Sequence, residues 1–173
     1  KGSTDVEASG IDIILALDVS GSMEALDFKL DGKQVNRLEA VKDVGAKFAS
    51  QRPNDKLGMV GFAGRPYLVS PLTMDHEFLR KRLKDVKMGQ VEDGTAIGSA
   101  IVSSVDHLRD STAKSKIVIL LTDGVNNAGS ANPLTATEAA KALGIKIYTI
   151  GAGTQGEAPF PVQVGFGQVR MQM

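Results

Sequence analysis

The sequence predicts an α/β domain built on a doubly wound, mostly parallel sheet with helices on both faces. Two observations support this fold class. Short, almost wholly apolar runs of strand length recur, as in sheets covered on both faces, at residues 12–17, 56–62, 115–121 and 145–150. Between these runs, apolar residues repeat every three to four positions, as in helices that bury one face. This alternation favours parallel strands joined by crossover helices.

The remaining signals place the elements in order. Residues 63–65 are too few for a crossover, so the strands around them are expected to be antiparallel, which gives the sheet one short antiparallel edge strand. In the first third of the chain we expect a lead-in at 1–10, strand 12–17, a loop at 18–23, a mixed segment at 25–36 with a turn at 31–32, and a helix from 37. Strands 56–62 and 66–69 and helices 75–86 and 96–108 follow. The last regular elements are strand 115–121, a helix opened by the capping box 135–138, and strand 145–150.

The last stretch, residues 151–173, departs from this rhythm. It contains Pro159 and Pro161, further glycines and an alternating end, which indicate a loop followed by an irregular hairpin. We therefore expect a single domain over residues 11–173 with an irregular C-terminal segment.

Composition narrows the function classes. The 173 residues suffice for one domain with a sizeable core. A formal net charge of zero argues against a general nucleic-acid binder. The sequence contains no cysteine, which excludes disulfides and thiolate metal sites, and no apolar run approaches the roughly 20 residues of a membrane span. No nucleotide site is expected, because no helix opens after the G-x-G-x-x-G spacing at 151–156.

Polar side chains gather where ligands bind in open α/β sheets, beyond the carboxyl ends of the strands. Asp18, Ser20 and Ser22 follow the first strand, Asp123 follows a later one, and Thr95 opens a helix. Each of these residues alone could simply cap a helix or close a turn. Capping does not require three clusters to converge on one edge, and oxygen ligands of this kind suit a hard cation such as Mg²⁺.

The order D-x-S-x-S, then Thr, then Asp resembles the metal-ion-dependent adhesion site of von Willebrand factor A domains, across residues 11–150. The resemblance implies that Ser20, Ser22 and Thr95 offer hydroxyls to the metal, and that Asp18 and Asp123 bind it directly or through water. The implied cofactor is Mg²⁺, or Mn²⁺ or Ca²⁺ in its place. A cation held mainly by neutral groups keeps much of its charge, so we expect a protein partner that supplies an Asp or Glu carboxylate.

Further short matches resemble the bacterial Bat proteins of aerotolerance operons, of the BatA type. This resemblance implies a membrane-anchored protein whose domain faces the periplasm, acting in stress tolerance with other Bat proteins or a MoxR-type AAA+ ATPase. The sequence departs from the family's pattern in two places. The segment 29–35 is a few residues longer than expected, and the sequence ends before the family's last helix and strand. The matching stretches are Ser22-Met23, Asp27-Phe28, Asn36-Arg37-Leu38-Glu39-Ala40, residues 122–129 and residues 156–162.

The function expected from the sequence is a metal-dependent protein-interaction module without enzymatic activity or catalytic residues, because no nucleophile–base pair is recognisable. One alternative is a Mg²⁺-dependent phosphoryl-transfer enzyme that uses Asp18 as its nucleophile. Such enzymes carry D-x-D, and Ser20 occupies the position of their general acid. The other alternative is a structural domain whose site stays empty.

Overall fold

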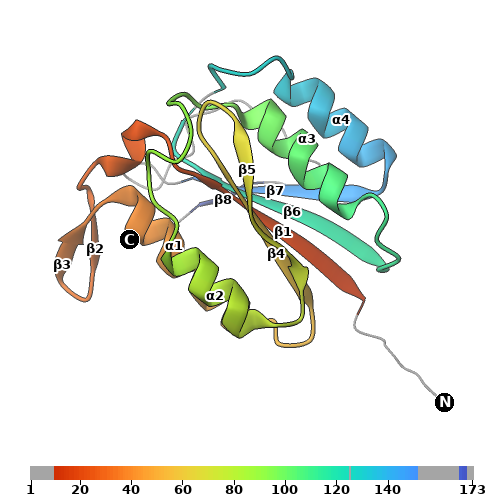
Figure 1. The fold of residues 1–173 in the computed structure, drawn as a ribbon, viewed down its shortest axis with the longest axis horizontal. Helices are drawn as coiled ribbons and strands as arrows, with labels where there is room; N and C mark the ends of the chain where they lie inside the picture. The colour runs from red at the N-terminus through yellow and green to blue at the C-terminus, as the bar shows by residue number, and fades with distance from the viewer. Residues whose placement is uncertain (1–9, 125, 152–167, 171–173) are drawn as a thin grey trace.

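A six-stranded sheet lies at the centre of the molecule (Figure 1). The computed structural model describes residues 10–124, 126–151 and 168–170. The strands of the sheet are β1 (Ile11–Asp18), β4 (Lys56–Phe62), β5 (Pro66–Thr73), β6 (Ser115–Thr122), β7 (Ile145–Gly151) and β8 (Gln168–Arg170). Their order is β5-β4-β1-β6-β7-β8, and only the edge pair β4 and β5 is antiparallel. The predicted α/β fold class is confirmed.

Helices cover both faces of the sheet. Figure 1 shows α1 (Arg37–Ser50) and α2 (His76–Lys84) on one side, with α3 (Ile97–Leu108) and α4 (Pro133–Ala142) on the other. A short 3₁₀ helix, η2 (Gly21–Glu24), follows β1. Within the described ranges, no helix has the length and apolar character needed to cross a bilayer.

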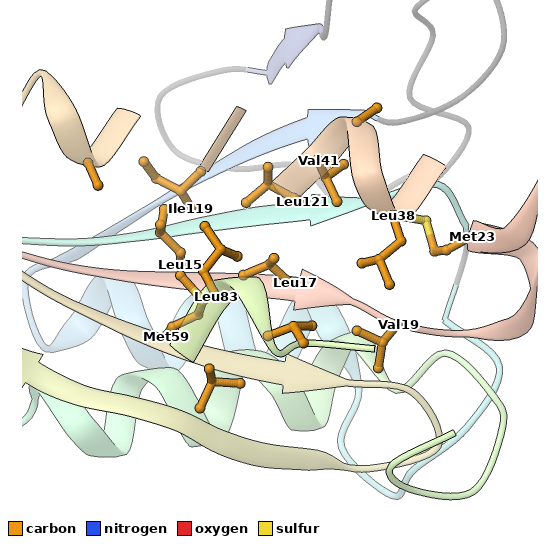
Figure 2. Close-up of a cluster of buried hydrophobic side chains, with 14 of the residues drawn as sticks. Leu15, Leu17, Val19, Met23, Leu38, Val41, Met59, Leu83, Ile119 and Leu121 are labelled. Carbon is orange, nitrogen blue, oxygen red and sulfur yellow. The ribbon is translucent and has the colours of Figure 1, made fainter. Parts of the chain in front are cut away.

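The core consists of two apolar layers, one on each face of the sheet. In β1, Ile13, Leu15 and Leu17 pack on the α1 and α2 side, whereas Ile14 and Ala16 pack on the α3 and α4 side. Figure 2 shows Leu15 and Leu17 in the first layer, among side chains of both helices and of β6. Because successive side chains of a strand point to opposite faces, burial of both faces explains the continuous apolar run.

Side-chain caps fix where the helices begin. Asn36 caps α1 and Asp75 caps α2, each by accepting a backbone N–H three residues on. The start expected for α4 was wrong. Asn132, rather than Thr135, is its N-cap and accepts the N–H groups of Leu134 and Thr135. Pro133 then occupies the first turn, where its missing N–H costs nothing.

The mixed segment 25–36 contains a hairpin that the periodicity did not predict. Strands β2 (Phe28–Leu30) and β3 (Lys33–Val35) pair antiparallel across a turn at Asp31 and Gly32. Both turn residues have positive φ, 53° and 80°, as a type I′ hairpin turn requires. Only the Asp-Gly pair signalled this hairpin, because its strands are too short to show alternation.

The C-terminal segment lies mostly outside the described residues. Its described part after β7 is β8, which pairs with β7 in parallel and extends the sheet by one strand. The irregular hairpin expected within residues 151–173 lies outside the described residues, apart from β8.

Gly98, in the first turn of α3, allows α3 and α4 to approach closely. A Cβ at Gly98 would lie 2.2 Å from the carbonyl oxygen of Ala131. We expect Gly98→Ala to reduce the free energy of unfolding by about 1–3 kcal/mol through overpacking, despite the better helix propensity of alanine. Gly45→Ala in α1 is the control, because its Cβ would make only an ordinary contact with Leu83 at 3.6 Å. Equal stabilities of the two variants in urea denaturation would contradict this account.

Candidate functional site

The site lies where β1 and β6 end. The two strands are parallel neighbours with Leu17 opposite Leu121, so their carboxyl ends meet at one edge of the sheet. Asp18 is the last residue of β1, and Asp123 follows β6 directly. The topology thus brings the two strand-end carboxylates together, as the sequence predicted.

Three side-chain oxygens lie in contact at this edge. The Ser20 and Ser22 hydroxyl oxygens are 3.1 Å apart, and the Ser22 hydroxyl donates to Asp123 Oδ1 at 3.0 Å. Ser20 and Asp123 are buried, whereas Ser22 is exposed. The group is therefore anchored in the protein and open to solvent on one side.

Asp18 is fully buried beneath this group. Its Oδ1 accepts the backbone N–H of Ser20 at 2.8 Å, and its Oδ2 accepts the Thr122 hydroxyl at 2.5 Å. Burial raises the pKa of Asp18 from 3.8 to about 6, although these hydrogen bonds oppose the rise and the nearby Asp123 charge adds to it. A carboxylate with this environment is costly to ionise unless a cation lies close by.

Thr95 is held beside the loop that follows β6. Its N–H donates to Asn127 Oδ1 at 2.8 Å, and its carbonyl accepts the Asn127 N–H at 2.9 Å. The Thr95 hydroxyl lies 3.7 Å from where a Cβ of Gly124 would stand. Thr95 is thus next to the residue that follows Asp123, and its anchor Asn127 is a contributor that sequence reasoning had not assigned.

Arg37 supplies the positive charge at this edge. Its Nη1 donates to Asp123 Oδ2 at 2.8 Å. Its Nε and Nη2 donate to the carboxylate oxygens of Asp27 at 2.7–3.1 Å. Asp27 first and then Asp123 raise the pKa of Arg37, so the guanidinium stays charged. The two oxygens of Asp123 are thereby divided between Ser22 and Arg37. The sequence signal was an arginine in the first turn of a helix, where the helix dipole disfavours a cation.

Asp93 closes the other flank of the site loop. Its Oδ1 accepts the backbone N–H of Gly21, between the two serines, at 2.9 Å. The hydrogen bonds from the Gly21 and Gly94 N–H groups lower the pKa of Asp93, which therefore stays ionised at neutral pH. The sequence pointed to Thr95, two residues further on, but assigned no role to this carboxylate.

The donor set is suited to a small hard cation. In octahedral Mg²⁺ coordination, with ligands about 2.0–2.1 Å from the metal, neighbouring ligand oxygens lie about 2.8–3.0 Å apart. The spacings from Ser20 to Ser22 and from Ser22 to Asp123 are close to that value. In the described ranges, no three His, Cys, Asp or Glu side chains gather as a metal cluster, so a metal here would depend on the hydroxyls.

The Asp18 carboxyl makes the metal-free protein sensitive to pH. Below pH 3.8 it is protonated in both the folded and the unfolded chain; between 3.8 and about 6 only the folded chain keeps the proton. We therefore expect its contribution to stability to fall as pH rises through this window, by on the order of 3 kcal/mol. The measurement is urea denaturation in EDTA from pH 3.5 to 7.5. At each pH, the free energy of unfolding of Asp18→Asn is subtracted from that of the wild type. A difference that does not change with pH would contradict the burial argument.

These features define an open α/β domain with an oxygen-lined loop cluster at the carboxyl edge of its sheet. Residues 12–161 match the von Willebrand factor type A domain. The chain belongs to that family. It spans 43–45% of the length of the curated relatives that it matches.

Three solved structures show the likeness in three dimensions. An aerotolerance-related membrane protein from Bacteroides fragilis has a TM-score of 0.78 and 23% identity, covering 94% of this chain and 92% of that one. BatB from Bacteroides thetaiotaomicron, described as a conserved hypothetical protein, has a TM-score of 0.76 and 29% identity. The match covers 95% of this chain and 76% of that one. An uncharacterized membrane-spanning protein from Vibrio fischeri has a TM-score of 0.56 and 41% identity. The match covers 82% of this chain and 70% of that one.

The chain therefore resembles BatB, at 29% identity, and a membrane-spanning protein, at 41% identity. The Bat protein named among these structures is BatB, whereas the sequence motifs resembled the BatA type. The match to the B. fragilis protein shows the fold alone, at 23% identity. The finer BatA-type assignment stays a prediction.

Proposed function

We propose that the domain is a metal-dependent protein-interaction module that binds a partner carboxylate through a divalent cation. Ser20, Ser22, Thr95, Asp18 and Asp123 would hold the cation, with Mg²⁺ favoured and Mn²⁺ or Ca²⁺ as substitutes. The observation that carries this proposal is the contact of three side-chain oxygens above a fully buried carboxylate. A cation would offset the cost of ionising Asp18.

The charge balance favours an acidic partner. Three of the five donors are neutral hydroxyls, and Arg37 already neutralises part of the Asp123 charge. A bound Mg²⁺ would therefore retain positive charge toward the exposed side, where Ser22 faces solvent. An Asp or Glu of another protein could replace a water on that side.

The surroundings favour binding over catalysis. The two histidines of the sequence lie on α2 and α3, and each bonds a backbone carbonyl, His76 that of Asp55 and His107 that of Ser103. These hydrogen bonds tie both imidazole rings to parts of the chain other than the site loop. At the position where aspartyl phosphoryl-transfer enzymes carry their general acid, Ser20 contacts Ser22. We therefore propose that the domain has no enzymatic activity.

The resemblance to Bat proteins suggests the setting for this interaction. We propose a membrane-anchored protein whose domain faces the periplasm and acts in stress tolerance with other Bat proteins or a MoxR-type ATPase. The description of one solved relative, at 41% identity, as a membrane-spanning protein supports the anchored setting.

Ser22→Ala tests the metal site directly. We expect at least tenfold weaker Mg²⁺ and Mn²⁺ binding in calorimetry and a smaller rise in melting temperature at saturating metal. Stability without metal should change by less than about 1 kcal/mol, because Ser22 is exposed. Ser50→Ala, an exposed serine at the end of α1, is the matched control and should bind metal like the wild type.

Three results would contradict the proposal. Unchanged metal affinity in Ser22→Ala would remove the serine from the site. No stabilisation of the wild type by any divalent cation would favour a purely structural domain. Mg²⁺-dependent hydrolysis of a phosphate ester that is lost in Asp18→Asn would favour the phosphoryl-transfer alternative.

A further inference from the structure

A cavity of about 360 Å³ opens beside the site loop. Gly21, which lies between the two site serines, forms part of its wall, and Asp93 forms another part. These two residues are joined by the 2.9 Å hydrogen bond from the Gly21 N–H to Asp93 Oδ1. The cavity and the candidate metal site therefore share one loop, and a short peptide segment can reach both.

The cavity has an apolar base. Val19 and Ala63 are buried members of the core layer beneath α1 and α2, and Met88 and Val91 are partly buried against the same layer. These side chains offer a surface for methylene groups. Burying a side chain of three or four methylenes there is favourable by roughly 25 cal/mol per Å² of apolar area removed from water.

The charged residues that line the cavity, Glu24 and Asp93, are both acidic and both exposed. The Gly21 N–H holds the Asp93 carboxylate in a fixed position at the mouth. An apolar side chain entering here would strip water from the two carboxylates without replacing its hydrogen bonds. A side chain with an apolar stem and a cationic head complements both the base and the mouth.

We propose that this cavity receives a Lys or Arg side chain that lies one or two positions from the metal-binding Asp or Glu in the partner's sequence. The stem packs on Val19, Met88 and Val91, and the head pairs with Asp93 and Glu24. An extended chain advances about 3.3–3.6 Å per residue, so a residue one or two positions from the metal ligand stays close to the loop that the two subsites share. This assignment rests on the proposed function and specifies its partner as a mixed acidic and basic motif.

Selection from a random heptapeptide library with a fixed central Asp tests this proposal. The domain is presented with Mg²⁺ or with EDTA. We expect Mg²⁺-dependent enrichment of Arg or Lys one or two positions from the Asp. A synthetic peptide from that pool should bind about three- to tenfold tighter than the same peptide with citrulline, the neutral analogue of arginine.

Variants of the domain identify the cavity as the cause. Asp93→Asn keeps an oxygen for the Gly21 N–H, and Glu24→Gln keeps the shape of the side chain, so each removes charge alone. Both should reduce the preference for arginine over citrulline, measured for each variant at its own saturating Mg²⁺ concentration. Glu92→Gln is the matched control: Glu92 neighbours Asp93 and is exposed, but it pairs with Arg65 and does not line the cavity.

The outcomes separate this inference from the proposed function. Peptide binding that needs Mg²⁺ and Asp but shows no basic preference would overturn the inference and leave the proposed function standing. A preference that survives in Asp93→Asn combined with Glu24→Gln would overturn the inference in the same way. Binding that is equal in EDTA would overturn both. Dimerisation lost in Asp93→Asn, without basic preference, would overturn the inference by assigning the cavity to a second copy of the chain.

Discussion

Asp18→Asn is expected to abolish Mg²⁺ binding and, at the same time, to stabilise the metal-free protein at pH 7. The fully buried carboxylate is costly to ionise, as its pKa of about 6 indicates, and asparagine removes that charge. An asparagine oxygen can still accept the Ser20 N–H, and its amide can donate to the Thr122 hydroxyl. We expect a gain of up to about 3 kcal/mol in the free energy of unfolding.

Calorimetry with Mg²⁺ and urea denaturation in EDTA measure the two effects on the same preparation. Asp12→Asn is the control, because Asp12 is also buried but lies near the opposite end of β1, where it accepts the Ser111 hydroxyl. This control should bind Mg²⁺ like the wild type. If Asp18→Asn retained Mg²⁺ affinity, Asp18 would not contribute its charge to the site.

Arg37→Met is expected to destabilise the metal-free protein by about 2–4 kcal/mol, and Mg²⁺ should recover part of that loss. The substitution keeps a long apolar stem but leaves the buried Asp123 side chain without its cation. Breaking a buried ion pair by removing one partner is strongly destabilising. A divalent cation on the other oxygen of Asp123 would compensate the same charge.

The rise in melting temperature at saturating Mg²⁺ should therefore be larger in Arg37→Met than in the wild type. Arg65→Met is the matched control, because Arg65 pairs with Glu92 while both side chains are about 60% exposed. Such pairs contribute between zero and about 1 kcal/mol. Equal stability losses in the two variants would show that the Arg37 contacts carry no special weight.

The sequence allowed the sheet and its helices to be predicted because most of their signals are local. A strand buried on both faces must be apolar throughout, and β4 was predicted with its observed ends. The hairpin of β2 and β3 was not foreseen, and neither was the parallel pairing of β8 with β7, since three-residue strands carry too little periodicity to indicate their partners. Their positions depend on pairing partners, which a pattern along one segment does not contain.

The site also has features that the sequence predicts and features that it does not. Convergence of Asp18 and Asp123 follows from strand order, since residues that end parallel neighbouring strands must meet. The pairing of Arg37 with Asp123 joins residues 86 positions apart and depends on how α1 packs, so no local rule predicts it. The Gly21 contact with Asp93 spans 72 positions and is equally non-local. Charge balance at the site was thus visible only in three dimensions.

Arg37 also isolates the site from the hairpin beside it. Its backbone N–H donates to the Ala25 carbonyl at 3.0 Å, and its side chain grips Asp27, so one residue fastens the base of the hairpin to α1. Beyond this fastening the hairpin projects from the domain, and most of residues 29–34 are exposed (Figure 1). The tip of the hairpin can therefore change in length while the loop of Asp18 keeps its shape. Variation in that outer surface would thus be confined to the exposed tip, because Phe28 at the base of the hairpin is buried in the core.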